Sequence, residues 1–164
     1  MKTPDLINVD DLFEKALSES LEGLAFIELE SHQKRQSLPG LREDDWVTRI
    51  SIDAPFQAFV TLIFDDTFAN DLVENVTMEM EKITETMIRD ALAEVANTVV
   101  GRLAYSLLDG ESDFSIGLPS CERGSHPGGV LSVSRKPTIL EFLMVEGRVL
   151  GIFETPDDAN VKVA

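Results

Sequence analysis

The stretch RDALAEVANTVVGRL, residues 89–103, decides how this chain folds. Numbered as an α-helix at about 100° per residue, it places aliphatic and polar side chains on opposite faces. The aliphatic face consists of Ile88, Leu92, Val95, Val99 and Leu103. The opposite face is a stripe about 60° wide, made of two acids, an amide and a glycine: Asp90, Glu94, Asn97 and Gly101. The pattern predicts a long helix, from about residue 84 to residue 107, with its aliphatic face on a core.

The polar stripe contains two poor helix formers. Asn97 and Gly101 each cost several tenths to about 1 kcal/mol relative to alanine in a helix interior. An ordinary solvated face would more cheaply carry Gln, Lys or Glu. Spacing alone leaves two interpretations open, a solvated face and a functional one.

Glu94 and Asn97 are one helical turn apart, so their side chains can reach the same point in space. A carboxylate can pair with a cation, and an amide can donate to one oxygen while it accepts from a water. Neither group is a nucleophile. The pair suits the positioning of a water that attacks a group bound by a partner.

Composition limits the function classes. The 164 residues are 43% hydrophobic and 27% charged, which predicts one globular domain over residues 1–164 with a frayed tail from about residue 155. The net charge of −16 argues against nucleic acid and anionic membranes as partners. The N-terminal residues MKTPDLINVDD lack the apolar core of a signal peptide, and no apolar run could span a bilayer. We expect a cytoplasmic protein.

The usual catalytic and metal-binding motifs are absent from the sequence. There is no GxxxxGK[ST] or GxGxxG stretch for nucleotides and no GxSxG elbow. His32 and His126 have no second imidazole or thiol nearby, so we predict no metal site. The lone Cys121 excludes a disulfide framework, and we expect it to be a half-buried structural residue.

The remaining segments predict the element order α-β-β-β-α-α-β-β-β-β. An amphipathic helix opens at Asp10 and Asp11 and ends at Gly23, and a second helix starts at Asp65 or Asp66 and covers residues 66–75. Strands are predicted from alternation, and loops from Gly, Pro and polar clusters: strands 24–30, 46–52, 56–64, 114–118, 130–134, 138–145 and 148–154, loops 31–45 and 121–129, and a hairpin turn at Glu146–Gly147. Strands grouped by hairpins with helices between the groups favour an α+β fold, a largely antiparallel or mixed sheet packed against long helices.

One further pattern spans the central helix and the strand after it. An Asp is followed after three residues by Glu, after two more by Asn, and about two dozen residues later by Pro: Asp90, Glu94, Asn97 and Pro119. This resembles the phosphatase signature of the CheC/CheX/FliY family. Two other segments, FQAFVTLIFDDTFANDLVENVTM and DDLFEKALSESLEGL, are similar to the family's strand-turn-helix and to the N-terminal helix of its CheX branch.

The resemblance implies a CheC-like fold and a function. Members of the family remove the phosphoryl group from the aspartate of a response-regulator receiver domain such as CheY. By position, Glu94 would form an ion pair with the receiver's lysine and Asn97 would orient the attacking water. Asp90, Gly101 and Pro119 would support the site or the partner contact. The Mg²⁺ belongs to the receiver, so the resemblance implies no cofactor of the protein's own.

The resemblance also bears on the branch of the family. CheC-type members carry the motif twice, but the N-terminal helix here has Asp10 and Glu14 followed by Leu17 in place of Asn. A single competent copy places the chain nearer the CheX branch, whose members form homodimers. Two alternatives to the phosphatase stay open: a non-catalytic receiver-binding or adaptor module, and a structural or motor-associated protein with this fold.

Overall fold

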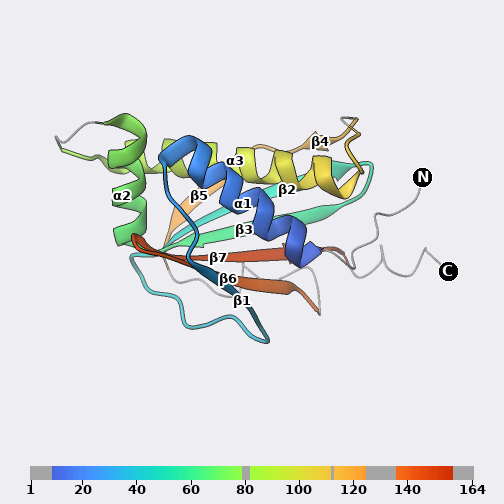
Figure 1. Ribbon diagram of the computed structural model, residues 1–164, viewed down its shortest axis with the longest axis horizontal. Helices are drawn as coiled ribbons and strands as arrows, with labels where there is room; N and C mark the ends of the chain where they lie inside the picture. Colours follow the sequence, from blue (N-terminus) through green and yellow to red (C-terminus); the bar gives the residue numbers. More distant parts are fainter. Residues whose placement is uncertain (1–8, 79–81, 112, 125–135, 157–164) are drawn as a thin grey trace.

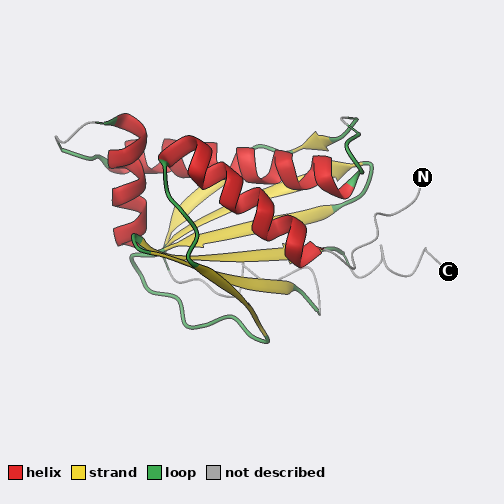
Figure 2. Cartoon of the chain, in the orientation of Figure 1, coloured by secondary structure: helices red, strands yellow, loops and turns green. Residues whose placement is uncertain are grey.

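The computed structural model describes residues 9–78, 82–111, 113–124 and 136–156, and these form helices packed on an antiparallel sheet (Figures 1 and 2). Groups of helices and groups of strands alternate along the described chain as predicted, but two of the strands lie in segments that were predicted as loops. The helices are α1 (Val9–Ala25), α2 (Asp66–Thr77) and α3 (Glu85–Leu107). The strands are β1 (Ser31–Arg35), β2 (Trp46–Ala54), β3 (Ala58–Phe64), β4 (Ser115–Ile116), β5 (Ser120–Arg123), β6 (Thr138–Met144) and β7 (Gly147–Glu154).

The strands of the described part form one seven-stranded sheet in the order β1-β6-β7-β3-β2-β4, and β5 also pairs with β2. Every pairing is antiparallel. α1 and α3 lie across one face of the sheet, whereas α2 stands at one end of it (Figure 1). The predicted α+β fold with an antiparallel sheet and long helices is confirmed.

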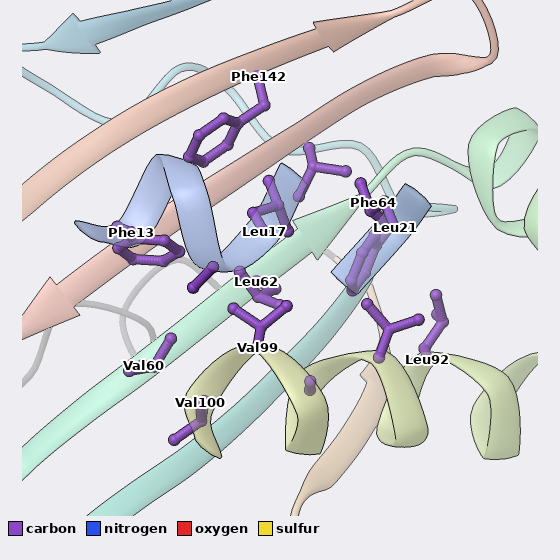
Figure 3. Close-up of a cluster of buried hydrophobic side chains, with 14 of the residues drawn as sticks. Phe13, Leu17, Leu21, Val60, Leu62, Phe64, Leu92, Val99, Val100 and Phe142 are labelled. Atoms are coloured by element: carbon purple, nitrogen blue, oxygen red, sulfur yellow. The ribbon is translucent and has the colours of Figure 1, made fainter. Parts of the chain in front are cut away.

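The main core lies between the sheet and the helices, and all five residues of the predicted aliphatic face of α3 are buried in it. Figure 3 shows α1 and α3 directing their side chains toward β3 and β6. The side chains that meet there include Phe13, Leu17, Leu21, Val60, Leu62, Phe64, Leu92, Val99 and Phe142. Burial of each such side chain contributes about 1.5–3 kcal/mol. This core fixes which face of α3 points outward.

The first predicted strand, residues 24–30, is wrong. α1 continues through Gly23 to Ala25, and the left-handed residue that ends it is Phe26, with φ of 56°. Ile27 is buried and Leu29 partly buried, so the alternation marks an extended connection along the core. The strand that follows α1 is β1, and it lies within the segment predicted as the loop 31–45. β1 is an edge strand with mostly exposed side chains, so its sequence lacks apolar alternation.

Other boundaries also differ from the prediction. Strand 114–118 is reduced to β4, and the predicted loop 121–129 begins with residues of β5. The hairpin turn is Val145–Glu146, one residue earlier than predicted, because Met144 pairs with Gly147. The predicted strand 130–134 and most of the predicted tail lie outside the described residues. None of the helices in the described ranges is long and apolar enough to cross a membrane.

Asp65, one of the two predicted caps, joins α2 to the β6–β7 hairpin. Its carboxylate accepts from the Phe68 N–H at 2.7 Å and from the Arg148 N–H at 2.9 Å. Gly147 has φ of 150°, and a Cβ there would lie 2.7 Å from the Asp65 carboxylate. The turn therefore needs glycine for its conformation and for space.

We expect Asp65→Ala and Gly147→Ala each to lower the melting temperature. Loss of a cap costs about 1–2 kcal/mol, or roughly 2–8 °C for a domain of this size. Thermal unfolding followed by circular dichroism measures the change. Glu43→Ala, which removes an exposed acid in a turn, is the matched control and should leave the melting temperature unchanged. Equal melting temperatures for all three variants would contradict this role of Asp65.

Candidate functional site

The structure places the polar stripe of α3 on the solvent side of the helix. Thr84 caps α3 by accepting from the Met87 N–H at 3.2 Å, and the aliphatic face below is buried. Asp90 and Glu94 are exposed, and Asn97 and Gly101 are partly exposed. The four residues predicted from the spacing therefore lie together on one accessible face.

Within the described part of the chain, the polar groups of this stripe have no side-chain partners. Among the described residues, Asp90 and Glu94 form no ion pair and the Asn97 amide forms no hydrogen bond. The hydrogen bond at Glu94 involves its backbone carbonyl, which accepts from the Thr98 hydroxyl at 3.0 Å. The carboxylates and the amide are thus free to bind groups outside the chain.

Gly101 is not required by the packing of the helix. A Cβ at this position would meet nothing within 4 Å. Its backbone is helical, so alanine would be the more stable choice on conformational grounds. Because glycine has no side chain, no side chain at position 101 covers the surface of α3 next to Asn97.

Two arginines define the sides of the stripe. Arg89 donates to the Cys121 carbonyl at 3.0 Å, which fixes the β5 side. Arg102 pairs with Glu19 at 3.0 Å, which fixes the α1 side. At about 100° per residue, Arg89 lies roughly 80° from Asn97 and Arg102 roughly 80° from Glu94. Asn97 is therefore on the side of the stripe that faces β5, and Glu94 is on the side that faces α1.

A cluster centred on Trp46 holds β5 in place beside α3. The Trp46 ring is buried, and the Arg123 guanidinium lies over it at 4.6 Å from the ring centre. Arg123 also pairs with Asp66 of α2 and, at 3.1 Å, with Glu85 of α3. Its planar guanidinium can make these contacts at once, since its N–H groups point in fixed directions. Four elements, β2, β5, α2 and α3, are joined at this point.

No pattern in the sequence indicates this cluster. The residues that contact Arg123 are far apart in the sequence, and neither Arg123 nor Arg89 belongs to a motif. Arg89 also approaches Trp46, at 5.6 Å from the ring centre. The cluster matters for the site because it sets the distance between α3 and the segment that enters β5.

Pro119 is the third predicted supporting residue, after Asp90 and Gly101. It is partly buried and lies on the segment that connects β4 to β5. No hydrogen bond or ion pair of the described residues joins it to Glu94 or Asn97. The Arg89–Cys121 bond connects its segment to α3 two residues farther along. The structure thus brings Pro119 to the side of α3 and not into direct polar contact with the stripe.

The N-terminal helix does not repeat the site. Leu17, where the family motif would have Asn, is fully buried in the core. Asp10, at the start of the partial motif, pairs with Lys34 at 3.2 Å. An Asn at position 17 would face the core, so α1 presents no second stripe to solvent.

The structure describes two of the other candidate residues, Cys121 and His32. Cys121 is half-buried, and burial raises the pKa of its thiol to about 11 even though the Arg89 charge lowers it. The thiol is therefore protonated near neutral pH, as expected of a structural cysteine. His32 lies on β1 with its ring 6.3 Å from that of Phe142, and His126 lies outside the described residues. In the part of the chain that the structure describes, no three His, Cys, Asp or Glu residues gather as a metal site would require.

The fold can be compared with known proteins. Among solved structures, CheX from Desulfovibrio desulfuricans matches with a TM-score of 0.73 at 18% identity, over 90% of this chain and 99% of that one. CheX from Vibrio vulnificus matches with a TM-score of 0.71 at 20% identity, over 88% of this chain and 97% of that one. A CheX–CheY–BeF3–Mg²⁺ complex from Borrelia burgdorferi matches with a TM-score of 0.72 at 15% identity, over 90% and 96% of the two chains. These likenesses establish the fold.

No curated protein matches the chain. The family model described as chemotaxis phosphatase CheX matches residues 47–140, more than half of the 164 residues. The matched region contains all of α3 and its polar stripe, together with Pro119. The chain therefore belongs to the chemotaxis phosphatase CheX family.

Proposed function

We propose that this protein accelerates hydrolysis of the aspartyl phosphate on a CheY-like receiver domain. The observation that carries the proposal is the exposed stripe on α3, where Glu94 and Asn97 lie one turn apart without internal partners among the described residues. Membership of the CheX family and the likeness to a CheX solved in complex with CheY support a receiver as the partner.

In the proposed reaction, a water oxygen bonds to phosphorus while the bond from phosphorus to the aspartate oxygen breaks. The products are inorganic phosphate and a free carboxylate on the receiver. Glu94 pairs with the receiver's lysine and so fixes the orientation of the two proteins. The Asn97 amide holds the water on the side opposite the leaving oxygen. Acceleration of this kind comes from positioning, which can be worth several kcal/mol of the barrier.

Under this proposal the receiver supplies the Mg²⁺ and the phosphorylated aspartate, and this chain supplies no cofactor. Mg²⁺ bound at the receiver would neutralise charge on the phosphoryl oxygens. The net charge of −16 favours approach to a partner site that carries an exposed lysine. As the CheX branch suggests, we also propose that the protein acts as a homodimer in the cytoplasm.

A paired experiment separates the phosphatase from an adaptor. The decay of a phosphorylated receiver in Mg²⁺ is measured with and without the protein, and binding to the same receiver carrying beryllofluoride is measured by calorimetry. The phosphatase predicts faster decay together with binding. Binding without faster decay would favour the adaptor, and the absence of both would contradict the proposed partner.

Gly101→Ala should affect folding and docking in opposite directions. Since a Cβ has open space there, the variant should gain up to about 1 kcal/mol, or roughly 2–4 °C in melting temperature. If the receiver's surface lies against Gly101, the added methyl group should weaken binding about tenfold.

Gly23→Ala is the matched control for Gly101→Ala. Gly23 is also a helical glycine at which an added Cβ would meet nothing within 4 Å, but it lies near the end of α1. It should raise the melting temperature without a change in receiver affinity. If both variants bind the receiver as tightly as the parent, Gly101 lies outside the contact.

A further inference from the structure

Leu118 is the most exposed large hydrophobic side chain of the described residues, at 94%. It lies between β4 and β5, next to Pro119, on the segment that passes beside α3. A leucine exposed to this extent gains nothing from the fold of the single chain. Its exposure alone needs no explanation, but the backbone around it is unusual.

The connection from β4 to β5 that carries Leu118 has one residue more than the part of β2 that it faces. Ile116 of β4 pairs with Ile52 of β2, and Ser120 of β5 pairs with Arg49. Gly117, Leu118 and Pro119 therefore face Ile50 and Ser51, three residues against two. An extra residue of this kind at a sheet edge, as in a β-bulge, can redirect a side chain away from the sheet.

Two hydrogen bonds connect this segment to β2, one before Leu118 and a longer one after it. The Gly117 N–H donates to the Ser51 carbonyl at 2.9 Å, and the Ser120 hydroxyl donates to the Arg49 carbonyl at 3.5 Å. Ile116 before it and Cys121 after it both pack against the main core. Leu118 is therefore an apolar side chain projecting from a fixed backbone, and its ordering on binding would cost little entropy.

The surroundings of Leu118 favour one kind of partner. On α3, Asn97 lies on the side that faces this segment. Asp90 and Glu94, which form no ion pair in the described part of the chain, follow on the same exposed stripe of a protein with net charge −16. A second copy of the chain would bring like charges together at this surface, which is unfavourable. A receiver that presents a lysine beside an apolar recess matches both the acidic stripe and the leucine.

Resting on the proposed function, we infer that Leu118 is a docking residue for the receiver. It inserts into an apolar recess beside the receiver's phosphorylated aspartate and sets the position of the partner relative to Asn97. It contacts neither the water nor the phosphoryl group. Its contribution therefore belongs to binding of the receiver and not to the chemical step.

The test is the rate of receiver dephosphorylation as a function of receiver-phosphate concentration. Leu118→Ala should raise KM about tenfold and leave kcat within twofold, since a central apolar contact is worth more than about 1 kcal/mol. Leu118→Asp should raise KM further. Val145→Ala and Val145→Asp are the matched controls, because Val145 is 82% exposed but lies in the β6–β7 turn at α2. Both controls should keep the parent KM.

The outcomes separate this inference from the proposed function. An accelerating parent whose Leu118 variants keep KM within twofold would overturn the docking role and leave the phosphatase standing. If the parent binds the beryllofluoride receiver without accelerating decay, a tenfold weaker Kd for Leu118→Ala would still support docking. If the parent protein neither accelerates decay nor binds the receiver, both the docking role of Leu118 and the proposed function are overturned. A shift from dimer to monomer in the Leu118 variants, with KM unchanged, would assign the residue to self-association instead.

Discussion

Asn97→Ala should abolish most of the acceleration and leave the fold and the binding of the receiver intact. The amide forms no hydrogen bond within the described structure, so its removal leaves no buried group unpaired. What is lost is the guide for the attacking water, and loss of such positioning costs about 100-fold or more in rate. Single-turnover decay of the receiver phosphate at saturating protein measures this effect.

The control for Asn97→Ala is Thr86→Ala, an exchange on the exposed side of α3 nearer its start. With this variant, the receiver phosphate should decay at the parent rate. Circular dichroism should show the same helix content for both variants and the parent. An Asn97→Ala protein that retains the parent rate would show that the water is guided by another group.

Glu94→Lys should weaken receiver binding far more than the same change in net charge at a position outside the contact. If the carboxylate pairs with a lysine of the receiver at a desolvated contact, its replacement leaves two cations facing each other. Loss of one partner in such a pair costs about 2–5 kcal/mol, or roughly 30-fold to several thousand-fold in Kd. Calorimetric titration of the beryllofluoride receiver measures the change.

Glu22→Lys is the matched control, because it changes the net charge by the same amount at an exposed position of α1. Its effect on Kd should be small and should vanish at high ionic strength, where long-range attraction is screened. Glu94→Gln should show the intermediate loss expected when the charge is removed and the shape is kept. Equal effects of Glu94→Lys and Glu22→Lys would contradict a specific ion pair.

The sequence was most informative where a local pattern sets the structure. The 3.6-residue period predicted α3 to within one residue at its start, because the aliphatic face must be buried and Thr84 can cap it. Cap preferences predicted Asp65 or Asp66 as the start of α2, and Asp65 is the residue that caps it. Alternation of apolar residues likewise predicted the central strands β2, β3, β6 and β7.

The features that the sequence did not predict lie at the edges of the sheet and in long-range contacts. β1 and β5 are paired strands with exposed side chains, so their formation depends on a neighbouring strand and not on their own pattern. The contacts of Arg123 with Trp46, Asp66 and Glu85 join residues far apart in the chain. The extra residue in the connection around Leu118 is visible only from the pairing of β4 and β5 with β2, which no local pattern reveals.

The measurement that tests the central claim most directly is turnover of a phosphorylated receiver by a small amount of this protein. The receiver is phosphorylated, freed of the phosphodonor and incubated in Mg²⁺ with one-tenth as much protein. The account predicts that phosphate is released from all of the receiver faster than by its own decay, and that Asn97→Ala removes the difference. Decay at the receiver's own rate, by a protein that binds the same receiver, would contradict catalysis by Glu94 and Asn97.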